Sequence, residues 1–151
     1  MKHYFAYGTL LDQAAMTAFA PSVVAEGLLR LDGYELGFAE THQPGKGGCW
    51  LVERPGAVTW GLNYALSDED MESMDRASGI PDGLWVKKAI IATDTSGKTI
   101  ETTTYTIPGT PPPFVPSEDY VRPILNGLAA LDLPPDYVAR MQQIVADARA
   151  T

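Results

Sequence analysis

The sequence predicts an α+β fold with a largely antiparallel sheet. The predicted strands come mostly first along the chain and two predicted helices come last, an order typical of α+β folds. Residues 84–94 and 98–107 read as two strands joined by a tight turn through Thr95, Ser96 and Gly97, as in an antiparallel pair. The chain has 151 residues, of which 45% are hydrophobic, and no internal repeat. We therefore expect a single domain over residues 1–151 with one core.

The chain opens with a predicted strand over residues 2–7, in which aromatic side chains fall on both faces. Gly8 is expected to end this strand, because glycine adopts φ angles that residues with a Cβ resist. A short helix is predicted over residues 10–19, before Pro21. The turn after Tyr7 therefore links a strand to a helix.

The middle of the chain is expected to hold strands and one loop. Residues 23–38 contain two strand segments divided by the turn-type pair Asp32 and Gly33. The segment ETHQPGKGGCW, residues 40–50, reads as a glycine-rich loop. Residues 57–66 form the clearest strand, with large apolar side chains on one face and small ones on the other. The small face leaves space for backbone or a ligand.

A helix beginning after Ser67 has the clearest boundaries in the chain. Ser67 is the expected N-cap, and Asp70 stands three residues later, as in a capping box. Gly79 is a suitable C′ residue and Pro81 a stop. The helix therefore ends close to residue 78.

The last third of the chain is predicted to be an extended segment followed by two helices. Residues 108–116 contain five prolines and read as a stiff linker. Ser117 is expected to cap a helix that runs towards Leu131. The segment LPPDY then begins the final helix.

Composition excludes several classes of function. The net charge of −8, with only 11 Lys and Arg, argues against a nucleic-acid partner, because phosphate binding needs clustered cations. The single cysteine, Cys49, and two histidines favour neither a disulfide nor a metal site. No apolar stretch reaches the roughly 20 residues of a membrane span. Without a secretory pattern at the N-terminus, the expected location is cytoplasmic.

Four segments, taken in order, resemble the gamma-glutamylcyclotransferase-like family. They are FAYGTLL, the GG…PG..TWG pattern over residues 47–61, MDRASGI, and PSEDYVRPILNGLAALDLPPDY. The resemblance covers nearly the whole chain. It implies a compact mixed, largely antiparallel β-barrel with flanking helices and one pocket beside the turn after the first strand. It also implies a cofactor-independent reaction in which the α-amine of a gamma-glutamyl group attacks its own γ-carbonyl and releases 5-oxoproline.

The resemblance also implies which residues bind the substrate, a small molecule with an amino-acid-like head group. Backbone N–H groups of a tight turn can hold a carboxylate or a developing oxyanion. Aromatic side chains would wall the pocket. The substrate-binding residues implied are Tyr7, Gly8, Thr9, Leu10, Trp85 and Tyr120.

One position departs from the family pattern. The family's acid/base glutamate immediately precedes the glycine after the helix, and Ser78 occupies that position here. A serine hydroxyl cannot take a proton from an ammonium group without a base beside it. Asp75, one helical turn earlier, is a possible substitute base. Further candidates are Glu72, Asp82, Glu40 and His42.

Three functional hypotheses remain open from the sequence. The first is an enzyme that cyclises or cleaves a small amino-acid-derived amide, with its base at a non-standard position. The second is a lyase or decarboxylase step in the same pocket. The third is a non-catalytic small-molecule-binding protein that kept the pocket and lost the glutamate. A buried carboxylate facing the turn would favour the enzyme, and a pocket without a titratable group would favour the binder.

Overall fold

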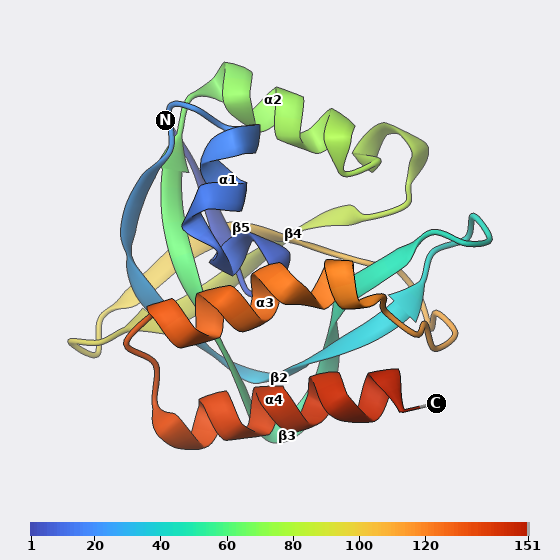
Figure 1. Cartoon of the computed structure of the whole chain (residues 1–151). Coiled ribbons are helices and arrows are strands. Elements are labelled where there is room, and N and C mark those ends of the chain that lie inside the picture. Colours follow the sequence, from blue (N-terminus) through green and yellow to red (C-terminus); the bar gives the residue numbers. More distant parts are fainter. Residues whose placement is uncertain (151) are drawn as a thin grey trace.

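The computed structural model of the chain describes residues 1–150 and contains five strands and four α-helices. The strands are β1 (Lys2–Ala6), β2 (Val24–Glu40), β3 (Gly47–Leu66), β4 (Val86–Asp94) and β5 (Thr99–Thr106). The helices are α1 (Gln13–Phe19), α2 (Asp68–Ala77), α3 (Glu118–Ala130) and α4 (Pro135–Arg149), with short 3-10 helices η1 (Thr9–Leu11) and η2 (Ile80–Asp82). In Figure 1, α2 lies over one end of the molecule, and α3 and α4 lie side by side towards the other.

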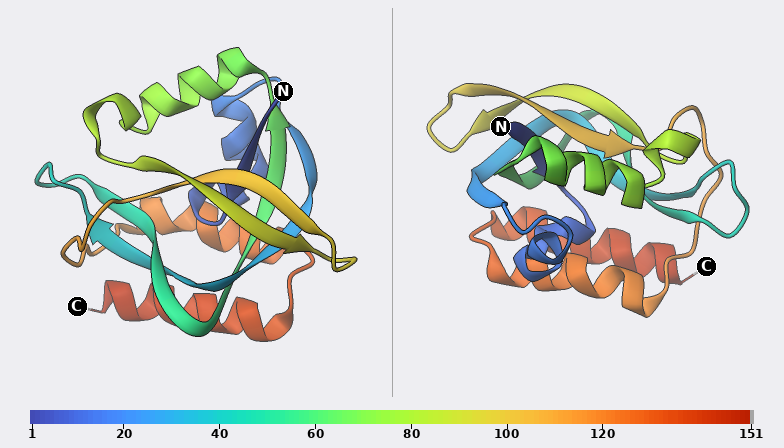
Figure 2. Two further views of the ribbon diagram at one scale, coloured as in Figure 1. Left: turned by 180° about the vertical axis from the view of Figure 1, so that it is seen from behind. Right: turned by 90° about the horizontal axis from the view of Figure 1, so that it is seen from above.

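The strands form one antiparallel sheet in the order β1-β3-β2-β4-β5. Neighbours in this order run in opposite directions, so the prediction of an α+β fold with an antiparallel sheet is confirmed. The sheet is strongly curled, as the two views of Figure 2 show. One apolar core joins buried residues of the strands with buried residues of α2, α3 and α4.

The predicted barrel is wrong, because β1 and β5 share no ladder of backbone hydrogen bonds. These outermost strands are instead joined through side chains. Thr104 Oγ1 donates to the Phe5 carbonyl at 2.6 Å, and the Tyr7 hydroxyl donates to the Tyr105 carbonyl at 2.7 Å. Side-chain bonds thus hold the ends of the sheet together without closing it.

Two further predictions about strands are corrected by the long pair β2 and β3. Gly33 does not divide two strands but lies within β2, at a register shift between Asp32 and Tyr34. Its φ of 85° is the left-handed backbone conformation that a bulge at this position needs. The glycine-rich segment is also mostly strand. Gly47 and Gly48 already pair with Glu40 and Ala39, so the loop shrinks to residues 41–46.

The predicted boundaries of α2 are confirmed. Ser67 Oγ accepts a hydrogen bond from the Asp70 backbone N–H at 3.1 Å, which caps the first turn. Gly79 has a φ of 72° and follows the C-cap Ser78. The helix therefore ends at a defined point, with the half-buried Ser78 as its C-cap.

Helix α3 packs directly on the turn that follows β1. A Cβ at Gly127 would collide with Leu11 of η1, so only glycine allows this close approach. Leu11 and Ile124 are fully buried here. The packing of α3 therefore holds the turn in place.

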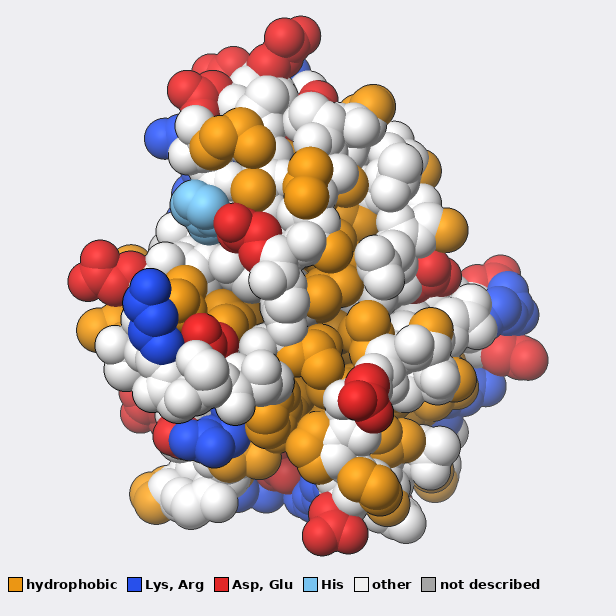
Figure 3. Space-filling view, turned by 90° about the vertical axis from the view of Figure 1, so that its left-hand side faces the viewer, with side chains coloured by type: hydrophobic (Ala, Val, Ile, Leu, Met, Phe, Trp, Pro, Cys, Tyr) orange, Lys and Arg blue, Asp and Glu red, His pale blue; other side chains and the backbone are white. Residues whose placement is uncertain are grey.

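Charged side chains of both signs are mixed on the surface. On the face in Figure 3, Lys and Arg side chains are scattered near Asp and Glu side chains. Glu35 pairs with Arg54 at 2.5 Å and with Arg140 at 2.8 Å, which ties α4 to β2 and β3. None of the helices within residues 1–150 is long and apolar enough to cross a membrane.

Candidate functional site

A cavity of about 240 Å³ opens at the C-terminal end of β1. Its wall combines the turn after β1 with residues from β3, β5, the C-terminus of α2, the segment before β4, and α3. The lining residues are Tyr4, Tyr7, Gly8, Thr9, Leu10, Cys49, Ala77, Ser78, Trp85, Tyr105 and Tyr120. The structure thus brings together Ser78 and all six residues for which the resemblance implied substrate binding.

The turn from Tyr7 to Leu10 is held on several sides. The Leu11 backbone N–H donates to the Gly8 carbonyl at 3.1 Å, and the Tyr64 hydroxyl donates to the Leu10 carbonyl at 3.0 Å. Gly8 has a φ of −121°, so the expected need for an unusual φ angle is wrong. Glycine is required for space instead, since a Cβ there would lie 2.8 Å from the Cys49 sulfur.

Two other lining residues are aromatic and are hydrogen-bonded to the backbone of Cys49. The Cys49 N–H donates to the Tyr120 hydroxyl oxygen at 2.9 Å, and the Trp85 indole N–H donates to the Cys49 carbonyl at 2.9 Å. The preceding residue, Gly48, has no room for a Cβ, which would collide with the Tyr120 hydroxyl. The start of β3 therefore orients both aromatic rings.

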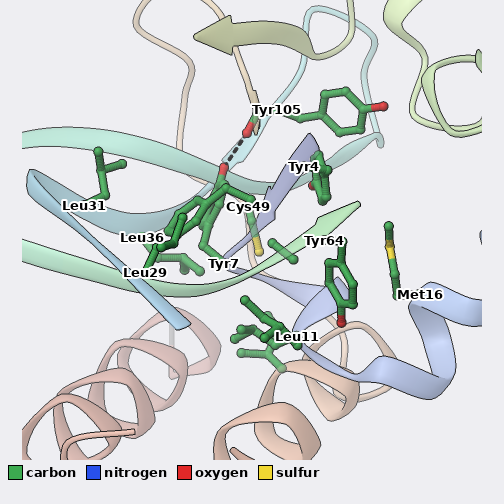
Figure 4. Close-up of a cluster of buried hydrophobic side chains, with 14 of the residues drawn as sticks. Tyr4, Tyr7, Leu11, Met16, Leu29, Leu31, Leu36, Cys49, Tyr64 and Tyr105 are labelled. Atoms are coloured by element: carbon green, nitrogen blue, oxygen red, sulfur yellow. Dashed lines mark hydrogen bonds between the residues drawn. The ribbon is translucent and has the colours of Figure 1, made fainter. Parts of the chain in front are cut away.

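Sequence reasoning missed four lining residues, of which Tyr4 and Tyr105 are the largest. Their rings lie 5.0 Å apart between centroids, and Figure 4 draws them near Cys49 and Tyr7. Alternation along β1 places Tyr4 and Tyr7 on opposite faces, but the strand ends at Ala6 and both reach the cavity. Tyr105, the one aromatic in a run of threonines, was the available signal. Cys49 and Ala77 carried none.

The titratable groups that line the cavity are uncharged at neutral pH. Burial raises the pKa of the Cys49 thiol to about 12, although hydrogen bonds from Tyr120 and the Thr9 backbone act in the opposite direction. Burial also raises the pKa values of Tyr7 and Tyr120 well above the usual value for tyrosine. No carboxylate belongs to the described lining. The cavity wall therefore offers neutral hydroxyl, thiol and backbone groups.

Asp75, the possible substitute base, lies immediately behind the wall. The Tyr105 hydroxyl donates to Asp75 Oδ1 at 2.5 Å, and Lys87 Nζ lies 2.6 Å from Asp75 Oδ2. The Asp75 side chain is 18% exposed. Burial, followed by the hydrogen bond to Asp75, raises the pKa of Tyr105 far above its usual value. A tyrosine of the cavity lining thus donates a hydrogen bond directly to a carboxylate.

Ser78 lines the cavity from the C-cap of α2. Its backbone N–H donates to the Met74 carbonyl at 2.9 Å, which fixes its place at the last turn. A hydrogen bond from the Ser78 side chain lowers the pKa of Tyr105, in opposition to Asp75. The residue at the family's glutamate position thus contacts the phenol that contacts Asp75.

The other candidate bases lie outside the cavity lining. Glu40 accepts a hydrogen bond from the Gly45 backbone N–H at 2.9 Å, and His42 Nε2 lies 2.9 Å from the Asp82 carbonyl oxygen. Glu72 and Asp82 have exposed side chains. Within residues 1–150, no group of three or more His, Cys, Asp or Glu could hold a metal ion.

Comparisons with known proteins agree with this fold. The chain is 27% identical over 146 residues to the gamma-glutamylcyclotransferase of Bos taurus, covering 93% of this chain and 77% of that protein. Its identity to the Homo sapiens gamma-glutamylcyclotransferase is 26% with the same coverage. A solved gamma-glutamyl cyclotransferase has the same fold, with a TM-score of 0.85 at 24% identity over 93% of this chain and 86% of that one. The family model for gamma-glutamyl cyclotransferase, AIG2-like proteins matches residues 4–122, and the chain therefore belongs to this family.

Proposed function

We propose that the protein is a cofactor-independent gamma-glutamylcyclotransferase-like enzyme that acts on a small amino-acid-derived amide. Membership of the family supports a cyclotransferase-like reaction. The single observation that carries the proposal is the cavity itself, which joins the Tyr7–Leu10 turn to Ser78, Trp85 and Tyr120. Its volume of about 240 Å³ suits a small head group better than a macromolecule.

The reaction would be an intramolecular aminolysis. The substrate's α-ammonium loses a proton, and the amine nitrogen attacks the γ-carbonyl carbon. The tetrahedral intermediate then loses a second proton from the attacking nitrogen and breaks its bond to the leaving nitrogen. The departing amine takes up both protons, and 5-oxoproline is released. Holding the amine beside its own carbonyl supplies much of the rate, because attack within one molecule is strongly favoured by orientation.

The cavity residues would divide the binding tasks. Backbone N–H groups of Gly8, Thr9 and Leu10 would hold the substrate carboxylate or the oxyanion, since no Lys or Arg belongs to the described lining. Trp85 and Tyr120 would flank the ligand. Asp75 would act as the base in place of the family's glutamate, because its carboxylate is bonded to the cavity residue Tyr105. We also propose a cytoplasmic location, with no nucleic-acid or membrane partner.

The test is 5-oxoproline release, followed by mass spectrometry over a panel of gamma-glutamyl amines and peptides. We expect turnover by the wild type. Turnover only after Ser78→Glu would show that the pocket binds gamma-glutamyl groups but serves another reaction, such as a lyase step. Absence of product from both proteins would count against the gamma-glutamyl pocket.

A second candidate function is ligand binding without catalysis. The observation that favours it is the uncharged lining, in which Ser78 replaces a carboxylate. In this case, calorimetry would detect binding of a gamma-glutamyl amide that is recovered unchanged after prolonged incubation. Recovery of 5-oxoproline instead would rule out this candidate.

A further inference from the structure

We propose that Tyr105 is a catalytic residue that relays protons between the substrate amine and Asp75. The inference rests on the proposed function and deepens it by naming the group that replaces the family's glutamate. It follows from three residues on separate elements: Asp75 on α2, Lys87 on β4 and Tyr105 on β5.

The position of Asp75 requires an intermediary. Asp75 is not part of the cavity lining, whereas Tyr105 is. One carboxylate oxygen accepts the Tyr105 hydroxyl at 2.5 Å, and the other lies 2.6 Å from Lys87 Nζ. A proton from the cavity therefore reaches the carboxylate through the phenol.

The arrangement also defines how the proton moves. A buried phenol bonded to a carboxylate resists ionisation, so Tyr105 cannot first become a phenolate and then act as a base. Both transfers must take place together. The phenol oxygen takes a proton from the substrate ammonium while its own proton passes to Asp75 Oδ1. The two transfers reverse when the leaving nitrogen is protonated, so the enzyme ends each cycle unchanged.

Ser78 does not act as a base, so the proton can pass through Tyr105 to Asp75. Its short side chain lines the cavity together with Tyr105 and lowers the pKa of that phenol. A serine there does not compete with the phenol as a base, because its hydroxyl has little acid–base strength at neutral pH. A glutamate at the same position would take the proton directly and make the relay unnecessary.

The experiment compares Tyr105→Phe with wild type and with Tyr137→Phe. Tyr137 is a matched control, because it is a buried tyrosine whose hydroxyl bonds to a backbone carbonyl, that of Trp60, away from the cavity. General acid–base groups contribute roughly 10²–10⁴-fold to rate. We expect Tyr105→Phe to lower kcat by that order with little change in KM, and Tyr137→Phe to retain the wild-type kcat.

Two further measurements separate a proton relay from a structural role. The single-turnover rate constant of the wild type, measured in H₂O–D₂O mixtures, should depend non-linearly on the deuterium fraction, since two protons move at once. The double variant Ser78→Glu/Tyr105→Phe should recover much of the lost kcat, because the new carboxylate takes the proton directly. A purely structural tyrosine would yield neither result.

The outcomes distinguish this inference from the proposed function. A wild type that releases no 5-oxoproline overturns both. An active wild type with Tyr105→Phe within twofold of it, or with a linear dependence on deuterium, overturns the relay alone. The isotope measurement needs no variant, so it decides the question even where Tyr105→Phe fails to fold.

Discussion

Two networks of hydrogen-bonded side chains, here called the Tyr105 chain and the Thr102 chain, start from opposite faces of strand β5 and reach different residues. From Tyr105, one chain runs to Asp75 and Lys87. From Thr102, three residues earlier, the other runs to the Asn63 side chain, on to Glu26 and then to His3. The first joins β5 to helix α2 and to the neighbouring strand β4, whereas the second joins β5 to β3, β2 and β1.

The two networks differ in whether their polar groups are bonded only to other protein groups or also belong to a residue that lines the cavity. Thr102 donates to Asn63 Oδ1 at 2.8 Å, and Asn63 Nδ2 donates to Glu26 at 3.1 Å, so the buried amide is satisfied by protein groups on both sides. Tyr105, in contrast, lines the cavity of about 240 Å³. We infer that the Tyr105 chain serves chemistry and that the Thr102 chain stabilises the sheet.

The largest expected effect is that of Asp75→Asn on catalysis. The amide cannot accept the relayed proton, so we expect kcat to fall by roughly 10²–10⁴-fold. The melting temperature should change little, because Lys87 is 40% exposed and is solvated without its partner. Steady-state kinetics and thermal unfolding check the two halves of the prediction. The control is Glu72→Gln, at an exposed side chain of the same helix, which should change neither kcat nor the melting temperature.

Asn63→Ala tests whether the Thr102 chain stabilises the sheet. It leaves the buried Thr102 hydroxyl without its acceptor and Glu26 without the amide donor, and we expect the free energy of unfolding to fall by about 1–3 kcal/mol. Urea unfolding measures this, while kcat of the folded variant should equal that of the wild type. Asn126→Ala, at an exposed asparagine, is the control and should change stability by less than about 0.5 kcal/mol. A loss of kcat in folded Asn63→Ala would contradict the division of roles.

Gly48→Ala tests how the cavity wall is positioned. The added methyl would displace the Tyr120 hydroxyl from its hydrogen bond to the Cys49 N–H. Loss of one such bond is worth about 1 kcal/mol, so we expect KM to rise several-fold. In a Tyr120→Phe background the same change should have a smaller effect, since that hydroxyl is already absent. Additive effects in the double variant would show that Gly48 acts elsewhere.

The smallest expected effect concerns pH and Cys49. Folding raises the thiol pKa from 9.0 to about 12, so the folded state holds its proton more tightly than the unfolded state. This contribution to stability is present below pH 9 and is lost as the pH rises towards 12. Between pH 9 and 10, we expect the loss to be about 1 kcal/mol. The free energies of unfolding in urea of the wild type and of Cys49→Ala should diverge by this amount over that pH range. An equal pH dependence of the two free energies would contradict the prediction.

Local patterns in the sequence predicted much of this protein. The α+β class, the β4–β5 hairpin and the caps of α2 at Ser67 and Gly79 follow from signals carried by neighbouring residues. Capping and strand alternation depend on residues a few positions apart, and they can therefore be read from one segment at a time. The resemblance of four ordered segments to the family also predicted a pocket beside the turn after the first strand.

Tertiary structure alone decided the long β2–β3 pair, the open sheet and the Asp75–Tyr105 contact. Asp75 and Tyr105 are 30 residues apart, and neither has a local signal that names the other. Alternation along β1 assigned Tyr4 to the face opposite Tyr7, yet both border the cavity because the strand ends between them. Contacts between distant segments arise when helices and strands pack on one another. The position of a side chain along its own strand or helix therefore does not specify its partner.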